Sequence, residues 1–146
     1  MPLLANKIAF VTGAGSGIGR AGAIAMAQQG AQVIVSDLDA KKSTQVANEI
    51  ISKGHNATSY GLDVLDDIAL KAIIDETVKT FGNIDILHSH AGYQTEGNLE
   101  EVSIEGMDLS WKLNVRSHFI ASRAVVHHMR KPVSYTHLTL PTKRIV

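Results

Sequence analysis

Apolar residues follow two different spacings along the chain. Short runs rich in β-branched residues alternate with stretches in which apolar residues recur every three or four positions. Runs of the first kind predict buried strands, whereas the second spacing predicts amphipathic helices. The strands are predicted at 7–12, 32–36, 57–62 and 84–88. The helices are predicted at 18–29, 41–53, 68–81 and 107–130.

Three of the predicted helices are followed directly by a glycine. Gly30, Gly54 and Gly82 stand at the positions where glycine commonly ends a helix. Strands that alternate with helices of this length are typical of a parallel sheet, in which each helix forms a right-handed crossover. We therefore expect an α/β fold of about four βα units, with helices on both faces of one parallel sheet.

The end of the chain differs from the rest. The last predicted helix carries an apolar stripe, for which packing on the core is the ordinary explanation. The stripe consists of Met107, Trp111, Val115, Phe119, Val126 and Met129. Beyond it, residues 132–146 contain two prolines and neither glycine nor acidic residues. We expect this tail to add no stable element to the sheet.

Composition restricts the class of protein. The chain has 146 residues, 45% of them hydrophobic, which suits a domain with a buried core. Its 14 basic and 14 acidic residues balance, so no field favours nucleic acid or an anionic membrane. No apolar run approaches the roughly 20 residues that span a bilayer, and no signal peptide is evident. We therefore expect a cytoplasmic protein that binds neither nucleic acid nor a membrane.

Metal and thiol chemistry are not expected. Cysteine is absent, which excludes disulfides and thiolate sites. Among the histidines, His88 and His90 are expected to share one strand face, whereas His127 and His128 are expected to diverge on a helix. No acidic residue is placed to complete a ligand set with them, so no metal site is predicted.

A glycine-rich turn follows the first predicted strand and opens the first predicted helix. Glycines let the chain turn sharply, and the helix points its positive end and free N–H groups toward an anion. In this turn Gly13 would form the tight bend, Gly17 would admit a pyrophosphate, and Gly19 would let helix and strand pack closely. A second match to the dinucleotide pattern, which also includes Gly22, is discounted because it lies inside the helix. The alternative is a structural turn without a ligand.

Asp37 ends the second predicted strand, about 20 residues after the glycines. An acidic side chain at this place can accept hydrogen bonds from a ribose 2′-hydroxyl and would repel a 2′-phosphate. No arginine or lysine stands between Gly13 and Gly19 to compensate. The alternative is a solvated turn residue, and Asp39 shares the same loop.

Taken together, these motifs resemble the short-chain dehydrogenase/reductase family. Beyond the glycine turn with Thr12, the family's adenine-side aspartate matches Asp63, and its Asn-Asn-Ala-Gly element matches residues 89–92 with Ala91 and Gly92 kept. Its Asn-Val element matches Asn114 and the next residue. The resemblance covers residues 7 to about 129 and implies a Rossmann-type domain over 1–131. It implies cofactor contacts from Gly13, Ser16, Gly17, Ile18, Gly19, Asp37, Asp63, Val64, Ala91 and Gly92.

The resemblance also implies an activity. Family members move hydride between a secondary alcohol or ketone and nicotinamide, and Asn114 corresponds to the residue that holds a water in their proton relay. The implied cofactor is NAD, because Asp37 disfavours a 2′-phosphate. The implied partners are a small-molecule alcohol or ketone and further copies of the same subunit, since the helix of the apolar stripe often packs on its counterpart.

Two departures from the family pattern stand out. His90 replaces an asparagine that stabilises the central sheet of family members. The catalytic serine and the Tyr-x-x-x-Lys pair are missing, because no tyrosine is followed four residues later by a lysine. The tail over 132–146 resembles translated non-native DNA. We therefore expect an incomplete domain and an inactive polypeptide that represents part of a longer enzyme.

Two other functions stay open from the residues alone. One is a dinucleotide-binding module without catalysis, and the other is an NADP-dependent reductase. Nucleotide-sugar enzymes and adenosyl-methyltransferases share this type of fold, but the Ala91–Gly92 and Asn114–Val115 elements argue against both.

Overall fold

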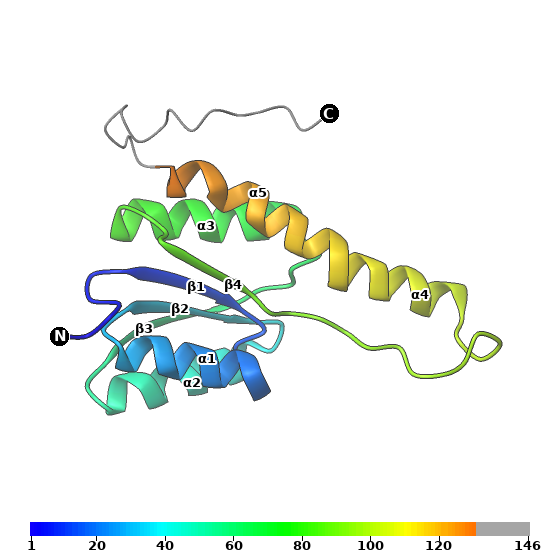
Figure 1. The fold of residues 1–146 in the computed structure, drawn as a ribbon, viewed down its shortest axis with the longest axis horizontal. Helices are drawn as coiled ribbons and strands as arrows, with labels where there is room; N and C mark the ends of the chain where they lie inside the picture. Colours follow the sequence, from blue (N-terminus) through cyan, green and yellow to red (C-terminus); the bar gives the residue numbers. More distant parts are fainter. Residues whose placement is uncertain (131–146) are drawn as a thin grey trace, which may run out of the picture.

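The computed structural model of the chain describes residues 1–130, so the prediction for the tail over 132–146 lies outside the described residues. The fold class is confirmed, since a parallel sheet is covered by helices on both faces (Figure 1). The strands are β1 (Ile8–Thr12), β2 (Gln32–Asp37), β3 (Asn56–Gly61) and β4 (Ile86–Ser89). The helical segments are α1 (Gly17–Gln28), α2 (Ala40–Ser52), α3 (Asp67–Phe81), α4 (Ile104–Trp111), η1 (Lys112–Arg116) and α5 (Ser117–Met129).

The order of the strands creates a binding crevice. The four strands lie in the order β3-β2-β1-β4, and all of them are parallel. The chain therefore runs outward from β1 to β3 on one side and continues at β4 on the other. In such sheets ligands bind beyond the carboxyl ends of the strands at the point where the strand order reverses. That point lies between β1 and β4.

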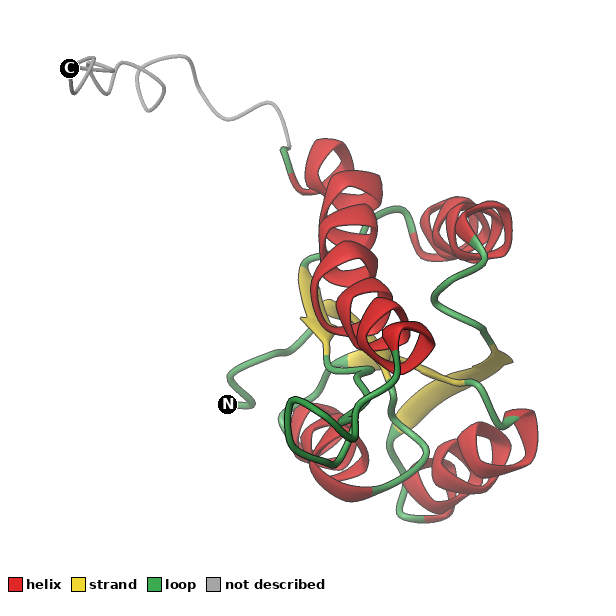
Figure 2. Cartoon of the chain, turned by 90° about the vertical axis from the view of Figure 1, so that its right-hand side faces the viewer, coloured by secondary structure: helices red, strands yellow, loops and turns green. Residues whose placement is uncertain are grey.

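Two apolar cores enclose the sheet. Along β1, Ala9 and Val11 face the core shared with α1 and α2, whereas Ile8 and Phe10 face the core shared with α3 and α5. Figure 2 shows the helices on either side of the strands. Because both faces are covered, β1 reads as a continuous apolar run without polar alternation.

Side-chain capping explains several of the helix ends. Asp39, Asp66 and Ser103 accept hydrogen bonds from backbone N–H groups in the first turns of α2, α3 and α4. Gly82 ends α3 in the left-handed conformation, with a φ of 86°. These residues match the preferences that sequence analysis uses for helix boundaries.

The predicted helix over 107–130 differs from the observed one at both its start and its middle. The observed helix begins at Ile104, because the side chain of Ser103 caps its first turn by accepting the N–H of Gly106. It then passes through the π-helical segment η1. A π segment inserts extra backbone into the turn, and a 3.6-residue periodicity does not reveal it. The strand predicted from residue 84 begins at Ile86, and the Asp85 carboxylate accepts the N–H of Ile8 at 2.9 Å.

The apolar stripe on this helix is mostly surface. Met107, Trp111 and Phe119 are 62%, 61% and 63% exposed, and Val115 and Val126 are also exposed. Packing on the core is therefore the wrong explanation for these five residues. Met129, in contrast, packs against the core next to α3. Among the described residues, no helix combines the length and apolarity needed to cross a membrane.

His127 and His128 do not diverge as predicted. Their ring centroids lie 3.8 Å apart, with the two rings tilted by 41°. Nε2 of His128 is buried without a hydrogen-bond partner, and it lies 3.9 Å from the Asp75 carboxylate on α3. Burial, followed by the neighbouring His127, lowers the pKa of His128 below its ordinary value of 6.5.

The replacement His128→Leu is expected to flatten the pH dependence of stability. Since the folded-state pKa is lowered, protonation of His128 is disfavoured in the folded chain, so stability is full above pH 6.5 and declines as the pH falls below that value. We expect the variant to raise the thermal midpoint by about 2–4 °C near pH 5.5, and by less at pH 8. Thermal scans between pH 5 and pH 8 measure this, with His55→Leu as the control. A variant with the wild-type pH slope would contradict the assignment.

Candidate functional site

A cleft of about 970 Å³ opens at the carboxyl ends of β1, β2 and β4. It brings together most of the predicted cofactor residues, although they are far apart in the sequence. Its lining includes Gly13, Ser16, Gly17, Asp37, Asp63, Val64, Ala91, Gly92 and Asn114. Ile18 and Gly19 were also predicted but do not line it. Gly19 is buried, whereas the side chain of Ile18 is 72% exposed on the first turn of α1.

The three glycines of the turn have separate roles. Gly13 has a φ of +63°, and a Cβ atom there would lie 2.9 Å from the backbone of Ala91. At Gly19 a Cβ atom would lie 2.1 Å from the carbonyl oxygen of Gly13, so only glycine permits this close approach of α1 to the turn. Gly17 has a φ of +55°, but a Cβ atom there would meet no protein atom within 4 Å. The space beside Gly17 is therefore open to a ligand.

The amino end of α1 is chemically open. Its N-cap residue, Ser16, makes no side-chain hydrogen bond to the helix, and its first turn holds no acidic residue. The amino ends of α2, α3 and α4 are all capped by side chains. The first N–H groups of α1 and the positive end of its dipole thus face the cleft, where an anion would be stabilised.

Gly22 is required by packing, which accounts for the second match to the dinucleotide pattern without a ligand. A Cβ atom at Gly22 would lie 2.9 Å from the imidazole ring of His88, so the ring occupies the space that a side chain would need. His88 in β4 and His90, one residue past its end, both face α1, with ring centroids 5.4 Å apart. Burial and then the neighbouring His90 lower the pKa of His88, which favours its neutral form. Within residues 1–130 no three histidine or acidic side chains gather as a metal site would require.

Asp37 links the second strand to the glycine turn. Its Oδ2 accepts the N–H of Gly15 at 2.9 Å, and its Oδ1 accepts the N–H of Asp39 at 2.9 Å. A carboxylate offers about four acceptor positions, so these two bonds orient the group and leave further positions free. Asp37 is therefore a held acceptor at the edge of the cleft, not a freely solvated turn residue.

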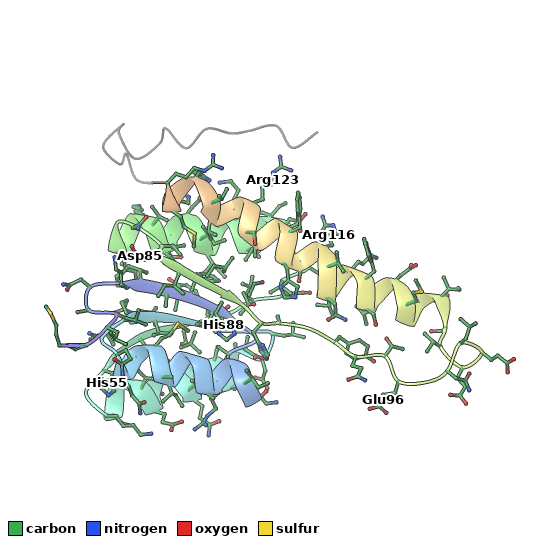
Figure 3. All side chains as sticks on the ribbon, in the orientation of Figure 1. His55, Asp85, His88, Glu96, Arg116 and Arg123 are labelled. Carbon is green, nitrogen blue, oxygen red and sulfur yellow. The ribbon has the colours of Figure 1, made fainter. Side chains whose placement is uncertain are left out.

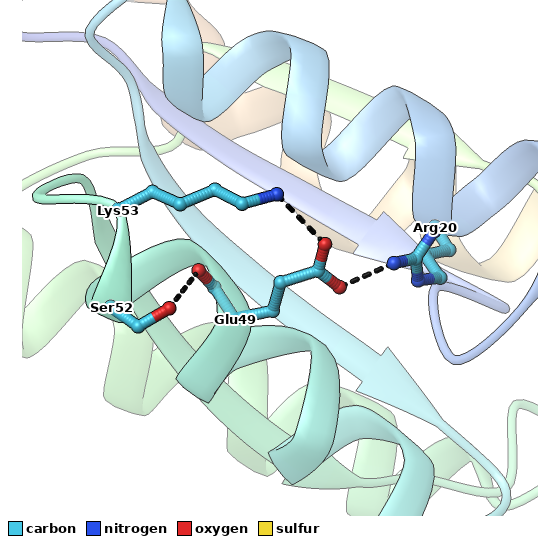
Figure 4. Close-up of polar contacts among 4 residues, drawn as sticks. All are labelled: Arg20, Glu49, Ser52 and Lys53. Carbon is cyan, nitrogen blue, oxygen red and sulfur yellow. Dashed lines mark hydrogen bonds and ion pairs between the residues drawn. The ribbon is translucent and has the colours of Figure 1, made fainter.

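The nearest arginine to the turn is engaged elsewhere. Arg20 on α1 pairs with the carboxylate of Glu49 on α2, which Lys53 also contacts at 2.9 Å (Figure 4). The hydrogen bonds from Lys53 and Arg20 lower the pKa of Glu49, so this carboxylate stays charged. In this arrangement the guanidinium of Arg20 is directed to α2.

Residues 89–93, here called the wall segment, form the side of the cleft next to β4. Thr12 Oγ1 accepts the N–H groups of His90 and Ala91 at 3.0 and 3.1 Å. The amide of Asn114 accepts the N–H of Tyr93 at 2.9 Å and donates to its carbonyl oxygen at 2.6 Å. Asn114 lies in η1, and π segments are frequent at functional sites. The observed role of the Asn114 side chain is to hold the wall segment.

The opposite side of the cleft contains Asp63 and Val64. Asp63 Oδ1 accepts the N–H of Leu65 at 2.9 Å, which shapes the turn that leads to α3. Asp67, at the start of α3, pairs with Arg116 through two hydrogen bonds of 2.9 and 2.6 Å. Arg116 (Figure 3) lies in η1, the segment that also contains Asn114. The pair ties the two sides of the cleft together, and its hydrogen bonds lower the pKa of Asp67.

Several lining residues were missed by the sequence analysis. Leu38 and Tyr93 follow predicted site residues directly, so proximity in sequence could have indicated them. His118, which contacts Ser89 but does not line the cleft, was also missed, because nothing in its surroundings along the chain suggests a contact with β4. Tyr60 does not lie in the cleft lining, and burial together with Glu76 raises its pKa, which disfavours proton exchange near neutral pH.

Comparison with protein families gives a match over most of the chain. The model described as "short chain dehydrogenase" matches residues 7–134. The chain is 37% identical over 129 residues to versicolorin reductase stcU of Emericella nidulans, covering 88% of this chain and 49% of that protein. It is 33% identical over 124 residues to the (2S)-[(R)-hydroxy(phenyl)methyl]succinyl-CoA dehydrogenase subunit BbsD of Thauera aromatica, covering 85% and 50%.

Solved structures agree with this match. A mutant of a Serratia marcescens short-chain dehydrogenase/reductase superposes with a TM-score of 0.82 at 35% identity, covering 88% of this chain and 53% of that one. The chain thus spans about half the length of the relatives that it matches.

Proposed function

Since this chain belongs to the short-chain dehydrogenase family, we propose that it forms the NAD-binding part of an oxidoreductase acting on a secondary alcohol or ketone. When bound, the nicotinamide ring supplies the hydride or accepts it. The chain's own residues bind and orient the dinucleotide. The dinucleotide-binding domain comprises residues 1–131, and the catalytic groups missing from this chain belong to the longer enzyme.

The open amino end of α1 supports a dinucleotide ligand. A pyrophosphate carries the negative charge that the uncapped N–H groups and the helix dipole stabilise. The empty space beside Gly17 lets phosphate oxygens approach the backbone closely. We assign Gly13, Ser16 and Gly17 to direct contact with the pyrophosphate. Gly19 supports the turn from behind, and Ile18 flanks it.

The remaining contacts follow the order of the strands. We assign Asp63 and Val64, after β3, to the adenine side of the cleft. Ala91 and Gly92, in the wall segment after β4, are assigned to the nicotinamide side. We assign Asn114 to the catalytic residues of the complete enzyme, where it would hold a water molecule of the proton relay.

The observation that carries the choice of NAD is the orientation of Asp37. Its carboxylate is fixed by the N–H groups of Gly15 and Asp39 at the edge of the cleft, where a ribose hydroxyl can donate to it. A 2′-phosphate at the same place would meet this negative charge. Arg20, which stands closest in sequence to the turn, is paired with Glu49.

The names of the relatives support the substrate class. The name of the Thauera aromatica protein describes a dehydrogenase acting on a compound with a hydroxy(phenyl)methyl group, which is a secondary alcohol. The Emericella nidulans protein is named as a reductase. We therefore propose reversible chemistry between a secondary alcohol and a ketone.

The replacement Asp37→Ala is expected to remove the preference for NADH over NADPH. In the wild-type chain we expect at least a tenfold preference, or about 1.4 kcal/mol, from hydrogen bonding to the ribose and repulsion of the phosphate. The two dissociation constants are measured by isothermal titration with residues 1–146. The matched control is Asp39→Asn, which removes the neighbouring charge but keeps an oxygen that can cap α2.

Three results would separate the alternatives. Equal affinities for the two cofactors in the wild-type chain, or an unchanged ratio in Asp37→Ala, would contradict the role of Asp37. A preference for NADPH would favour the NADP-dependent reductase. Binding by a longer native protein that shows no turnover would favour a dinucleotide-binding module.

A further inference from the structure

Two side chains of one helix hold the wall segment at its two ends. Asn114 holds Tyr93, and His118, four residues later on the same helix, contacts Ser89. The Oγ of Ser89 and the Nδ1 of His118 lie 2.6 Å apart and share a hydrogen bond in a partly buried environment. Residues four apart on a helix lie on the same face, so both contacts come from one side.

The direction of β4 explains why Ser89 meets His118. Successive strand residues point to opposite faces of the sheet. Ile86 packs in the core beneath α1 and α2, whereas Leu87 packs in the core next to α3 and α5. Figure 3 shows His88 near the end of β4, and its ring packs on Gly22 of α1. Ser89 therefore points to the α5 side, where His118 is the polar partner within reach.

The wall segment has a third support from the central strand. Ser89 is the register partner of Thr12 in the sheet, and the Thr12 hydroxyl accepts the next two backbone N–H groups. The contact with His118 is therefore made where the strand ends and the segment begins. Loss of this contact would let the end of β4 move, and would weaken the hydrogen bonds from the N–H groups of His90 and Ala91 to Thr12.

We propose that His118 is a positioning residue for the cofactor site, because its bond to Ser89 fixes the start of the wall segment. The inference rests on the proposed function only for the identity of the ligand. His118 acts through Ser89, and it sets where Ala91 and Gly92 lie relative to the cleft. A dinucleotide then binds to a wall that is already ordered, which avoids the entropy cost of ordering it on binding.

The inference predicts a local loss of order when either partner is removed. In ligand-free Ser89→Ala and His118→Leu, we expect amide hydrogen exchange at His90 and Ala91 to become about five- to tenfold faster, which is the effect of one hydrogen bond. The amide of Tyr93 should change less, because Asn114 still holds it. The double variant should show the effect of one single variant, since both remove the same bond.

A conservative variant and a matched control make the test specific. His118→Asn is expected to restore slow exchange, because its amide can donate or accept at a place similar to that of Nδ1. His55→Leu replaces a histidine in the turn before β3, away from the cleft (Figure 3), and should leave the wall segment unchanged. Exchange is followed by nuclear magnetic resonance on residues 1–146, and NADH affinity is measured on the same samples.

The outcomes separate this inference from the proposed function. Faster exchange with a roughly tenfold weaker NADH affinity in both single variants, and recovery in His118→Asn, would support the positioning role. Unchanged exchange at His90 and Ala91 in Ser89→Ala and His118→Leu would overturn it, whatever the wild-type chain binds. If the wild-type chain binds neither NADH nor NADPH, the proposed function fails, while the exchange rates still decide the role of His118.

Discussion

Replacing Gly17 by alanine is expected to weaken NADH binding by about 30-fold or more, while the folded structure is largely retained. A methyl group at Gly17 would project into the open space beside the amino end of α1, where the phosphate oxygens are proposed to lie. Loss of a charge-assisted hydrogen bond there costs about 2 kcal/mol, which corresponds to roughly 30-fold in affinity. Isothermal titration of NADH with residues 1–146 measures the effect.

Gly82→Ala provides the matched control. Gly82 has a φ of +86°, and a Cβ atom there would also meet nothing within 4 Å, but the residue lies at the end of α3, outside the cleft lining. Both variants place an alanine in the left-handed region at a cost of about 1 kcal/mol, so both should lose a few degrees of thermal stability. Only Gly17→Ala should lose affinity. Equal NADH affinities in the two variants would show that no phosphate lies beside Gly17.

The polypeptide of 146 residues is expected to show no turnover with secondary alcohols or ketones. Hydride transfer to a ketone leaves an alkoxide unless a proton donor is in place, and such a donor is typically worth about 10²–10⁴-fold in rate. Tyr60 lies outside the cleft lining, and burial raises its pKa. Tyr93 lines the cleft but is followed four residues later by Gly97, so no lysine stands one helical turn away.

Absorbance of the reduced nicotinamide at 340 nm, followed against a panel of secondary alcohols and ketones, tests this expectation. Cofactor binding without turnover is the expected combination. Sustained turnover that disappears in Gly17→Ala would contradict it. Such turnover would mean that another group of the cleft, with Tyr93 as the first candidate, exchanges the proton.

Local patterns along the chain were sufficient for most of the fold. The continuous apolar run of β1 required a strand covered on both faces, and Asp66 and Gly82 marked the start and end of α3. The positive φ of Gly13 and Gly17 and the close approach of Gly19 to Gly13 could be expected from the sequence, because a glycine turn depends on neighbouring backbone. The open amino end of α1 could not be predicted in the same way, since it depends on what the Ser16 side chain leaves unbonded.

Long-range contacts account for what the patterns did not show. The π segment η1 makes two long-range contacts, from Asn114 to Tyr93 and from Arg116 to Asp67, whose partners lie 21 and 49 residues away. The hydrogen bond between Ser89 and His118 joins residues 29 positions apart, and no spacing pattern in the sequence predicts it.

Local backbone chemistry therefore determined the strands, the helix ends and the glycine turn, because those features depend on residues within one or two turns of each other. The packing of distant elements decided the rest. It brought Asp37 to Gly15, Ala91 to Gly13 and His88 to Gly22, and it left the apolar stripe around Trp111 on the surface. An apolar spacing states that a face is hydrophobic, but only the tertiary structure determines what covers it.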